Sequence, residues 1–442
     1  MEMQVHRISK ETIKPSSPTP CHLHSFKISI LDQLFTSFYF PLLFFYTSSP
    51  HLSTDQKLTI LKDSLSKTLT RFYPLAGRIK DSINIDCNDE GVSLVETRVN
   101  CAMCDCLKPP ETESLSKLLP CQFTCPEPVE KAVQVAIQAN IFDCGGIALG
   151  ICFLHKLIDG TTFSAFIKSW AEIARGDGDK EVCVDSMVAS SLFPPNEAVS
   201  THMPFITQVV PTKEEGESSI KRFVFDEMSI SCLKNKARSE SVPNPTRVEV
   251  VSGLLWKCLT SASAMKLGSQ TSSVLVHIVN LRPRSNPPLP DYSIGNIIWR
   301  SIAYYDQVTM QDKNLPCLVD LLRKSKEVID SDYLQNLQGE EGYKQISNLL
   351  DDEGEIYSKS GIVYVFSSLV NMGFYEVDFG WGRPMWVTVG PIMQGELKNV
   401  VYQMESRSGG GMEIWVILNK RAMAILEHDP EIIQYATLNP DI

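Results

Sequence analysis

The sequence has too little positive charge to balance its acids. It contains 41 lysine and arginine residues against 52 aspartate and glutamate residues, a formal net charge of -11. Proteins that bind nucleic acid do so largely through basic side chains on phosphates. We therefore expect no nucleic-acid partner.

The sequence also lacks a segment typical of secreted or membrane proteins. Its most apolar early stretch, residues 35–46, is interrupted by Pro41 and is too short to span a bilayer, so it predicts a core strand. No secretory leader is visible, the sequon Asn244-Pro245-Thr246 is blocked by its proline, and the C-terminal Asn-Pro-Asp-Ile is no retention or peroxisomal signal. We expect a cytosolic protein.

Several motifs of catalysis and metal binding are absent. There is no Gly-x-Ser-x-Gly elbow of a serine hydrolase, and without a Gly-x-Gly-x-x-Gly or His-Arg-Asp loop the tripeptide at 378–380 does not indicate a kinase. The 13 cysteines include clusters at 101–106 and 121–125. No histidine lies near them, their spacing does not suit a zinc ribbon and their number is odd, so we predict free thiols and no metal.

What the sequence does contain is a histidine at the end of an uncharged apolar run. Residues 145–154 predict a buried strand, and residues 161–175 have apolar side chains at helical spacing. His155 therefore lies at the strand end and Asp159 at the N-cap of the helix. We interpret His155 as a candidate general base and Asp159 as a structural carboxylate. A histidine with a purely structural role is the alternative.

The spacing of these two residues is not specific by itself. The segment 51–55, His-Leu-Ser-Thr-Asp, has the same spacing, but it follows Pro50 in a polar loop, and Ser53 is predicted to cap the next helix. A second motif, residues 378–384 (Asp-Phe-Gly-Trp-Gly-Arg-Pro), predicts on its own a tight turn whose glycines adopt backbone angles that other residues avoid.

With both motifs in this order, the chain resembles the BAHD acyltransferases of plants, which transfer an acyl group from a coenzyme A thioester to an alcohol or amine. The resemblance covers nearly the whole length. The other matching segments are 15–20, 31–33 (Leu-Asp-Gln), 73–78, 87–92, 142–146, 280–284 (Asn-Leu-Arg-Pro-Arg) and 295–296 (Gly-Asn).

The resemblance implies a direct transfer without an acyl-enzyme. His155 would take the proton from the acceptor hydroxyl while the oxygen attacks the thioester carbonyl. Imidazole suits this role because its pKa lies near neutral pH, and a general base contributes about 10²–10⁴-fold. Hydrogen-bond donors would stabilise the oxyanion, and the Trp381 indole N–H and neighbouring backbone amides are candidates.

The resemblance also assigns roles to the two acids. Asp159 is expected to pair with Arg282. Asp378 is predicted as a catalytic residue in addition to His155. Because two carboxylates beside one imidazole would be redundant in a direct transfer, we favour for Asp378 the role of holding its turn. The residues predicted to support the site are Asp159, Arg282, Gly380, Trp381 and Gly382.

For the fold, the resemblance implies an α/β architecture with two similar domains of the chloramphenicol acetyltransferase type and a solvent channel between them. The polar, proline-bearing stretch 185–219 predicts a crossover linker. The first domain is then 1–184, with His155, and the second is 220–442, with the Asp378 turn. Strands are predicted at 222–226 and 274–279. We expect a monomer.

The resemblance is strongest to a branch that acetylates alkaloids and terpenoid alcohols. Acetyl-CoA is thus the favoured co-substrate, with no further cofactor, and an alkaloid or triterpenoid alcohol of limonoid type is the favoured acceptor. Residues 292–297 differ from the Tyr-Phe-Gly-Asn-Cys motif of malonyltransferases in the family. Because the chain is acidic and coenzyme A is an anion, a local basic patch is needed. Lys221, Arg247 and Lys257 are candidates for it, although any one of them is more simply a solvated surface side chain.

Two departures leave the acyl donor open. Leu369 stands where related members often have tryptophan. Because leucine is smaller than tryptophan, the channel would be wider and could accept malonyl or a bulkier acyl group. Arg300 is most simply a solvated residue at a strand end, although a carboxylate-bearing donor could use it. A catalytically idle metabolite-binding homologue and a hydrolase, in which water replaces the alcohol, are the remaining alternatives.

Overall fold

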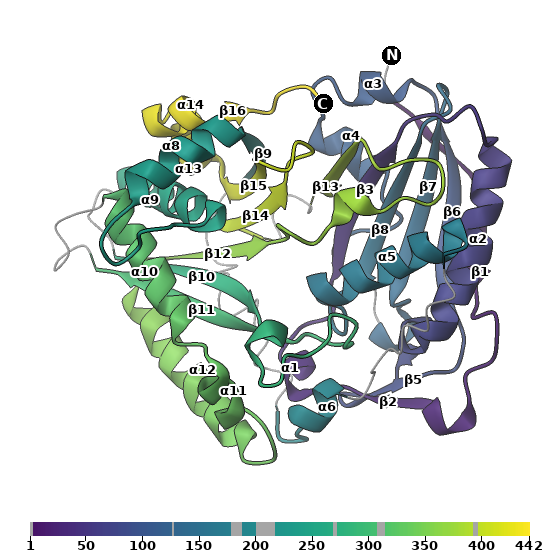
Figure 1. Ribbon diagram of the computed structural model, residues 1–442, viewed down its shortest axis with the longest axis horizontal. Coiled ribbons are helices and arrows are strands. Elements are labelled where there is room, and N and C mark those ends of the chain that lie inside the picture. The colour runs from purple at the N-terminus through teal and green to yellow at the C-terminus, as the bar shows by residue number, and fades with distance from the viewer. Residues whose placement is uncertain are drawn as a thin grey trace.

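The computed structural model describes residues 3–125, 128–177, 188–199, 217–267, 272–306, 314–391 and 397–442. Two large mixed sheets dominate them, one in each half of the chain, with helices packed on their outer sides (Figure 1). The predicted α/β class is confirmed. None of the helices in these ranges is both long and apolar enough to span a membrane.

The first sheet has six strands and carries the predicted strand before His155. Only the β6 and β7 pair is parallel, and the other neighbours are antiparallel. In spatial order the strands are β1 (Val5–Ile13), β6 (Val92–Val99), β7 (Val135–Phe142), β8 (Ile147–Leu154), β3 (Tyr39–Tyr46) and β13 (Trp386–Val389). A small sheet beside it contains β2 (Ser25–Lys27), β5 (Asn84–Asp86) and β4 (Arg78–Ile79).

Within the described ranges, the second sheet has seven strands. Parallel pairing of β10 with β12 and of β12 with β14 forms its centre. In spatial order the strands are β11 (Ile298–Tyr305), β10 (Ser273–Asn280), β12 (Ile362–Ser368), β14 (Val400–Glu405), β15 (Met412–Asn419), β9 (Ser218–Phe225) and β16 (Thr437–Leu438). The predicted strands at 222–226 and 274–279 therefore correspond to β9 and β10.

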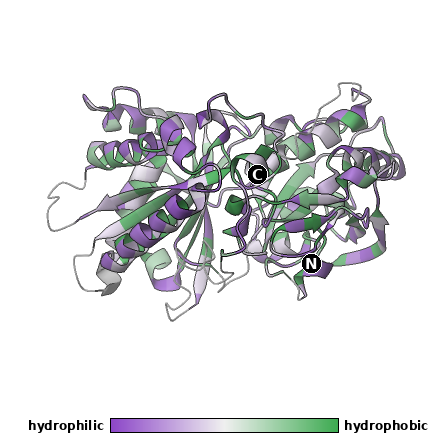
Figure 2. Ribbon diagram, turned by 90° about the horizontal axis from the view of Figure 1, so that it is seen from below, coloured by the Kyte–Doolittle hydropathy of each residue, from purple (hydrophilic) through white to green (hydrophobic). Residues whose placement is uncertain are grey.

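Helices cover the outer face of each sheet, and Figure 2 shows purple and green residues mixed along these helices, as amphipathic helices on a sheet would have. The helices of the first half are α1 (Ile30–Gln33), α2 (Thr54–Arg71), α3 (Met103–Cys106), α4 (Thr112–Lys117), α5 (Gly160–Arg175) and α6 (Val188–Leu192). Those of the second half are α8 (Glu227–Ala237), α9 (Arg247–Leu267), α10 (Leu315–Glu327), α11 (Ser331–Asn336), α12 (Gly342–Lys359), α13 (Lys420–Leu426) and α14 (Pro430–Tyr435).

The second sheet separates two apolar cores by the alternation of its side chains. In β12, Tyr364 and Phe366 lie in a core shared with α9 and α10, whereas Val363 and Val365 belong to the core of the first half. Side chains of a strand alternate between its faces, so one face of this sheet is directed at the first half. Strands of both halves therefore contribute side chains to the core between the two sheets.

One strand from the second half of the chain joins the first sheet. The strand β13 lies within 220–442, yet it pairs with β3 of the first sheet, from Trp386 opposite Phe45 to Val389 opposite Leu42. Without β13, the backbone N–H and C=O groups on one side of β3 would be unpaired. The strand from the other half pairs with them. The predicted linker 185–219 lies largely outside the described residues. Its described part includes α6, and β9 begins inside it at Ser218.

Candidate functional site

His155 lies directly after β8, at the edge of the space between the two halves. All eight residues of β8 are buried, as predicted for the uncharged run. The backbone N–H of His155 donates a 2.8 Å hydrogen bond to the carbonyl of Phe38, which extends the pairing of β8 with β3 by one residue beyond Leu154 and Tyr39. His155 is half-buried and its ring borders a cavity.

This cavity is lined by residues from both halves of the chain. Most of its lining is aromatic or aliphatic, and hydroxyl and amide side chains lie among the apolar groups. The lining residues are Phe35, Phe38, Phe40, Phe153, His155, Gly160, Thr161, Ile278, Asn280, Ile298, Val365, Ser367, Ser368, Leu369, Met372, Leu397, Val400 and Tyr402. A largely apolar cavity with a few polar groups is typical of a site for a small molecule.

Asp159 is the N-cap of α5 and the partner of Arg282. Its Oδ1 accepts a 2.8 Å hydrogen bond from the Thr162 backbone N–H, which is the predicted cap. Arg282 donates to both carboxylate oxygens, at 2.7 and 3.2 Å, and both side chains are at most 1% exposed. The ion pair expected from the family resemblance is therefore present. Both carboxylate oxygens of Asp159 thus accept hydrogen bonds from Arg282 and from backbone amides.

A second buried link holds the loop between His155 and Asp159, and the sequence did not indicate its role. The Asn296 amide donates to the carbonyls of His155 and Lys156, at 2.9 and 3.1 Å. The same amide donates at 3.0 Å to Asp32, which also accepts the Asn296 backbone N–H. Asp32 and Asn296 lie in two segments that matched the family, but their pairing across the chain is visible only in three dimensions.

The imidazole of His155 is in an environment that favours its neutral form. Burial lowers the pKa of His155 below its ordinary value of 6.5. Polar contact with its own backbone, the negative charge of Asp159 and the Asn296 side chain oppose this only in part. Within the described part of the chain, its Nδ1 has no hydrogen-bond partner. A neutral imidazole can accept a proton, so this environment suits a general base.

The Asp378 turn lies at the other end of β3 and β8. Tyr46, which pairs with Ile147 at the start of β8, donates its hydroxyl to the Val377 carbonyl at 3.0 Å. The eight residues of β8 separate this end from His155 by about 25 Å. Asp378 does not line the cavity, so the geometry supports a structural role for it rather than a part in proton transfer.

Hydrogen bonds inside the turn explain why it needs this acid and its glycines. Asp378 Oδ1 accepts from the backbone N–H groups of Gly380 and Gly382, at 2.8 and 2.9 Å. Both glycines have positive φ angles, 104° and 113°, which side chains of L-residues disfavour. The Arg175 guanidinium at the end of α5 donates to the Asp378 carbonyl. The turn thus closes the end of α5 that lies opposite Asp159.

Trp381, a candidate donor to the oxyanion, does not line the cavity beside His155. Its ring is buried and stacks on Phe379 with centroids 5.5 Å apart, and it meets Tyr46 edge-on at 6.3 Å. These contacts place it with the turn, away from the cavity at His155. The nearer donors are the side chains of Thr161, Asn280, Ser367 and Ser368 in the cavity lining. Of these four residues, only Asn280 lies in a motif named above, residues 280–284. No pattern in the sequence indicated that its side chain borders the cavity.

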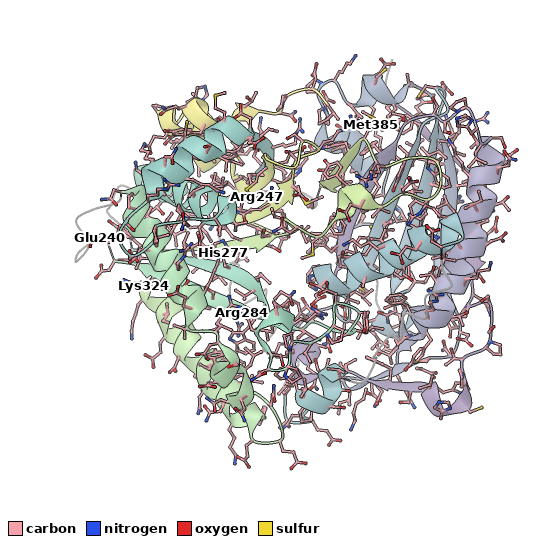
Figure 3. All side chains as sticks on the ribbon, viewed as in Figure 1. Glu240, Arg247, His277, Arg284, Lys324 and Met385 are labelled. Carbon is pink, nitrogen blue, oxygen red and sulfur yellow. The ribbon has the colours of Figure 1, made fainter. Side chains whose placement is uncertain are left out.

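The three basic candidates for coenzyme A do not form one patch. Lys257 lies 2.6 Å from Glu431, and Lys221 lies 3.4 Å from Glu427. Arg247, labelled in Figure 3 on the second half, lies 2.7 Å from Glu405 instead. Each cation is thus already balanced by a glutamate, which the sequence could not indicate because the partners are distant along the chain.

The interpretation of Arg300 as a solvated residue was wrong. Its side chain is 1% exposed, lies 2.9 Å from Glu353 and packs over the Trp299 ring. Burial raises the pKa of Glu353 to about 6, although the Arg300 charge lowers it. This buried pair lies beside a small pocket that shares Phe35 with the main cavity. In the described residues, no three His, Cys, Asp or Glu side chains are grouped as around a metal.

Comparison with known proteins agrees with this geometry. The model of the transferase family matches residues 3–433. The chain is 38% identical over 450 residues to akuammiline synthase 2 of Alstonia scholaris, covering 100% of this chain and 98% of that protein. It is 36% identical over 458 residues to limonoid 7-O-acetyltransferase of Citrus sinensis, covering 99% of both. The crystal structure of vinorine synthase is similar with a TM-score of 0.83, at 33% identity and 99% coverage of both chains. The chain therefore belongs to the transferase family of BAHD acyltransferases, and it is an acyltransferase.

Proposed function

We propose that this acyltransferase moves an acetyl group from acetyl-CoA to a hydroxyl of an alkaloid or a triterpenoid alcohol, with His155 as the general base. The observation that carries the proposal is the position of the His155 ring, at the border of a largely apolar cavity between the two halves. A hydroxyl placed in that cavity can reach the imidazole, and the neutral imidazole is ready to take its proton.

The lining of the cavity supports a largely apolar acceptor with only a few polar groups. Five aromatic side chains, Phe35, Phe38, Phe40, Phe153 and Tyr402, offer flat surfaces for fused rings. Limonoid 7-O-acetyltransferase, by its name, acetylates a substrate of this kind.

The chemical step would use groups of the chain alone. As His155 takes the hydroxyl proton, the alcohol oxygen attacks the thioester carbonyl, and the carbonyl oxygen becomes an anion. The hydroxyl and amide side chains of Thr161, Asn280, Ser367 and Ser368 line the same cavity as His155 and are the candidate donors to that anion. Collapse of the intermediate releases the coenzyme A thiolate, which the imidazolium then protonates.

The proposal is tested by product mass. Purified protein is incubated with acetyl-, malonyl- and benzoyl-CoA against a panel of alkaloid and triterpenoid alcohols. We expect an acetyl ester of at least one alcohol and coenzyme A release that depends on the alcohol. Thioester cleavage that the alcohol neither accelerates nor diverts into ester would make the protein a hydrolase. No turnover with any pair would favour an idle metabolite-binding protein, and a dominant malonyl ester would overturn the choice of donor.

Leu369 offers a direct test of how the cavity limits the acyl group. It lines the cavity, and one of its methyl carbons lies 3.0 Å from where a Cβ at Gly160 would be. Tryptophan at this position would fill space beside the start of α5. We expect Leu369→Trp to retain acetyl transfer better than benzoyl transfer, measured as the ratio of kcat/KM for the two donors. An unchanged ratio would place the acyl group elsewhere.

On the acid side, kcat/KM should fall with an apparent pKa below 6.5. Because burial lowers the pKa of His155, the base form is complete near neutral pH, and kcat/KM should rise with pH to a plateau with a midpoint below 6.5. Glu353 is the competing group, since burial raises its pKa to about 6. A Glu353→Gln variant should keep this fall at low pH, measured from initial rates across pH. Loss of the fall in that variant would assign it to Glu353.

A further inference from the structure

His155 lies within a group of phenylalanine rings. We call them the phenylalanine cage: Phe35, Phe38, Phe40 and Phe153. Their ring centroids lie 5.1, 4.9, 6.1 and 6.0 Å from that of the imidazole, in the same order. The Phe35 ring is nearly parallel to the imidazole, with an angle of 5° between the planes, whereas the Phe40 ring meets it at 80°. The imidazole is therefore confined both at its face and at its edge.

The register of the first sheet accounts for three of these rings. Phe40 pairs directly with Phe153 across β3 and β8, and the His155 N–H bond to the Phe38 carbonyl continues the same ladder. Residues two apart on a strand share a face, and so do residues directly opposite each other. Phe38, Phe40 and Phe153 are thus placed around His155 by backbone pairing.

Phe35 approaches from a different element and is held by the neighbour of His155. It follows α1, and the Lys156 ammonium donates to the carbonyls of Phe35 and Gln33, at 2.8 and 3.3 Å. The ammonium is nearly enclosed, and burial lowers the pKa of Lys156 to about 8. The residue after the histidine therefore anchors the segment that places the stacking ring on it.

No carboxylate orients the imidazole in the described part of the chain. In serine protease triads an acid holds the second nitrogen of the base and so fixes its orientation. Here Nδ1 of His155 has no partner among the described residues, and the Asp159 carboxylate is bound by Arg282 and by the Thr162 amide. We propose that the phenylalanine cage takes the place of that acid and holds the His155 ring in the orientation for proton abstraction. This inference rests on the proposed function.

The charged and titratable groups around the ring are few and are directed elsewhere. Asp159 faces Arg282, Lys156 faces backbone carbonyls, and Asp32 is bound by Ser29 and Asn296. From the opposite sheet, Tyr402 faces the same cavity, and burial raises the pKa of its phenol far above neutral pH. A change in the titration of His155 when the cage is altered would thus come from the cage and not from another titrating group.

The test replaces one ring of the cage and a matched ring outside it. Phe35→Leu removes the stacking ring and keeps an apolar side chain, and Phe35→Tyr restores an aromatic ring. Phe44→Leu is the control, because Phe44 is a fully buried residue of β3 that packs on Phe163 and Phe374 instead of the imidazole. For each variant, kcat, KM and the pH profile are measured, and the His155 ring is titrated by NMR without substrates, assigned with His155→Gln.

We expect Phe35→Leu to lower kcat about 10- to 100-fold, a larger factor than any rise in KM from the lost contact with the acceptor, because a misplaced base loses rate even when substrate binds. The midpoint of the His155 titration should rise toward 6.5 as water reaches the ring. Phe35→Tyr should recover most of kcat, and Phe44→Leu should lower the thermal midpoint while keeping kcat.

Three results would overturn the inference. They are a Phe35→Leu variant with wild-type kcat, a loss confined to KM, which would make Phe35 a substrate contact only, and an equal loss of kcat in Phe44→Leu. Failure of the proposed function would look different, because no donor and alcohol would then give an ester. In that case an unchanged His155 titration in Phe35→Leu would still reject control of the ring by the cage.

Discussion

Replacing His155 with alanine should abolish ester formation while the fold persists. A general base contributes about 10²–10⁴-fold, so kcat should fall by at least that range in assays with saturating donor. The thermal midpoint should change little, because the ring borders an existing cavity and its Nδ1 makes no hydrogen bond within the described residues. Both are measured on the same preparation, by product formation and by thermal unfolding.

Two other histidines provide controls for this variant. His51 has the same spacing to an aspartate but is exposed in its loop, so His51→Ala should change neither rate nor stability. His277, labelled in Figure 3, is buried in β10 and lies 3.0 Å from the Ser252 hydroxyl. His277→Ala should lower the thermal midpoint and leave the kcat of the folded protein intact. A fully active His155→Ala protein would remove the base from the mechanism.

Breaking the Asp159–Arg282 pair should cause a large loss of stability, unlike the replacement of His155. Both groups are at most 1% exposed, so Asp159→Ala leaves a buried guanidinium without its counterion. Such a change costs about 3–5 kcal/mol. The free energy of unfolding, measured in denaturant, should fall by that amount, and kcat should fall as well because the loop after His155 loses its anchor.

A surface pair and a double variant make this prediction specific. Lys344 and Glu341 lie at the same 2.7 Å as the buried pair, but their side chains are 70% and 83% exposed. Lys344→Ala should therefore cost at most about 1 kcal/mol. Asp159→Ala combined with Arg282→Ala removes both charges and should cost less than the sum of the two single variants. Additive losses would mean that the pair does not act as a unit.

The elements next to His155 were predictable from the sequence because their determinants are local. The uncharged run before His155 indicated β8, Asp159 marked the start of α5, and the predicted range 161–175 ends where α5 ends, at Arg175. Likewise Ser53 caps α2 and forms a capping box with Gln56. Each of these rests on residues within a few positions of one another, where pattern and propensity act directly.

The parts of the site that depend on distant contacts were not predictable. Asn296 and Asp32 are far apart in the chain, and nothing in either segment indicates that they clamp the loop after His155. Arg300 was misjudged because its partner Glu353 comes from a separate helix, α12. The cage was hidden for the same reason, since its rings come together only through the register of β3 with β8 and the anchoring of Phe35 by Lys156.

The strand β13 has a consequence for how the chain is made. A ribosome releases β3 early, but the strand that covers its edge emerges only after most of the polypeptide has been synthesised. Until then, four fully buried residues of the finished protein, Leu42, Leu43, Phe44 and Phe45, belong to a strand with an open side. Unpaired apolar strand edges promote aggregation of nascent chains. We therefore expect the first half, expressed without β13, to aggregate more readily than the whole chain.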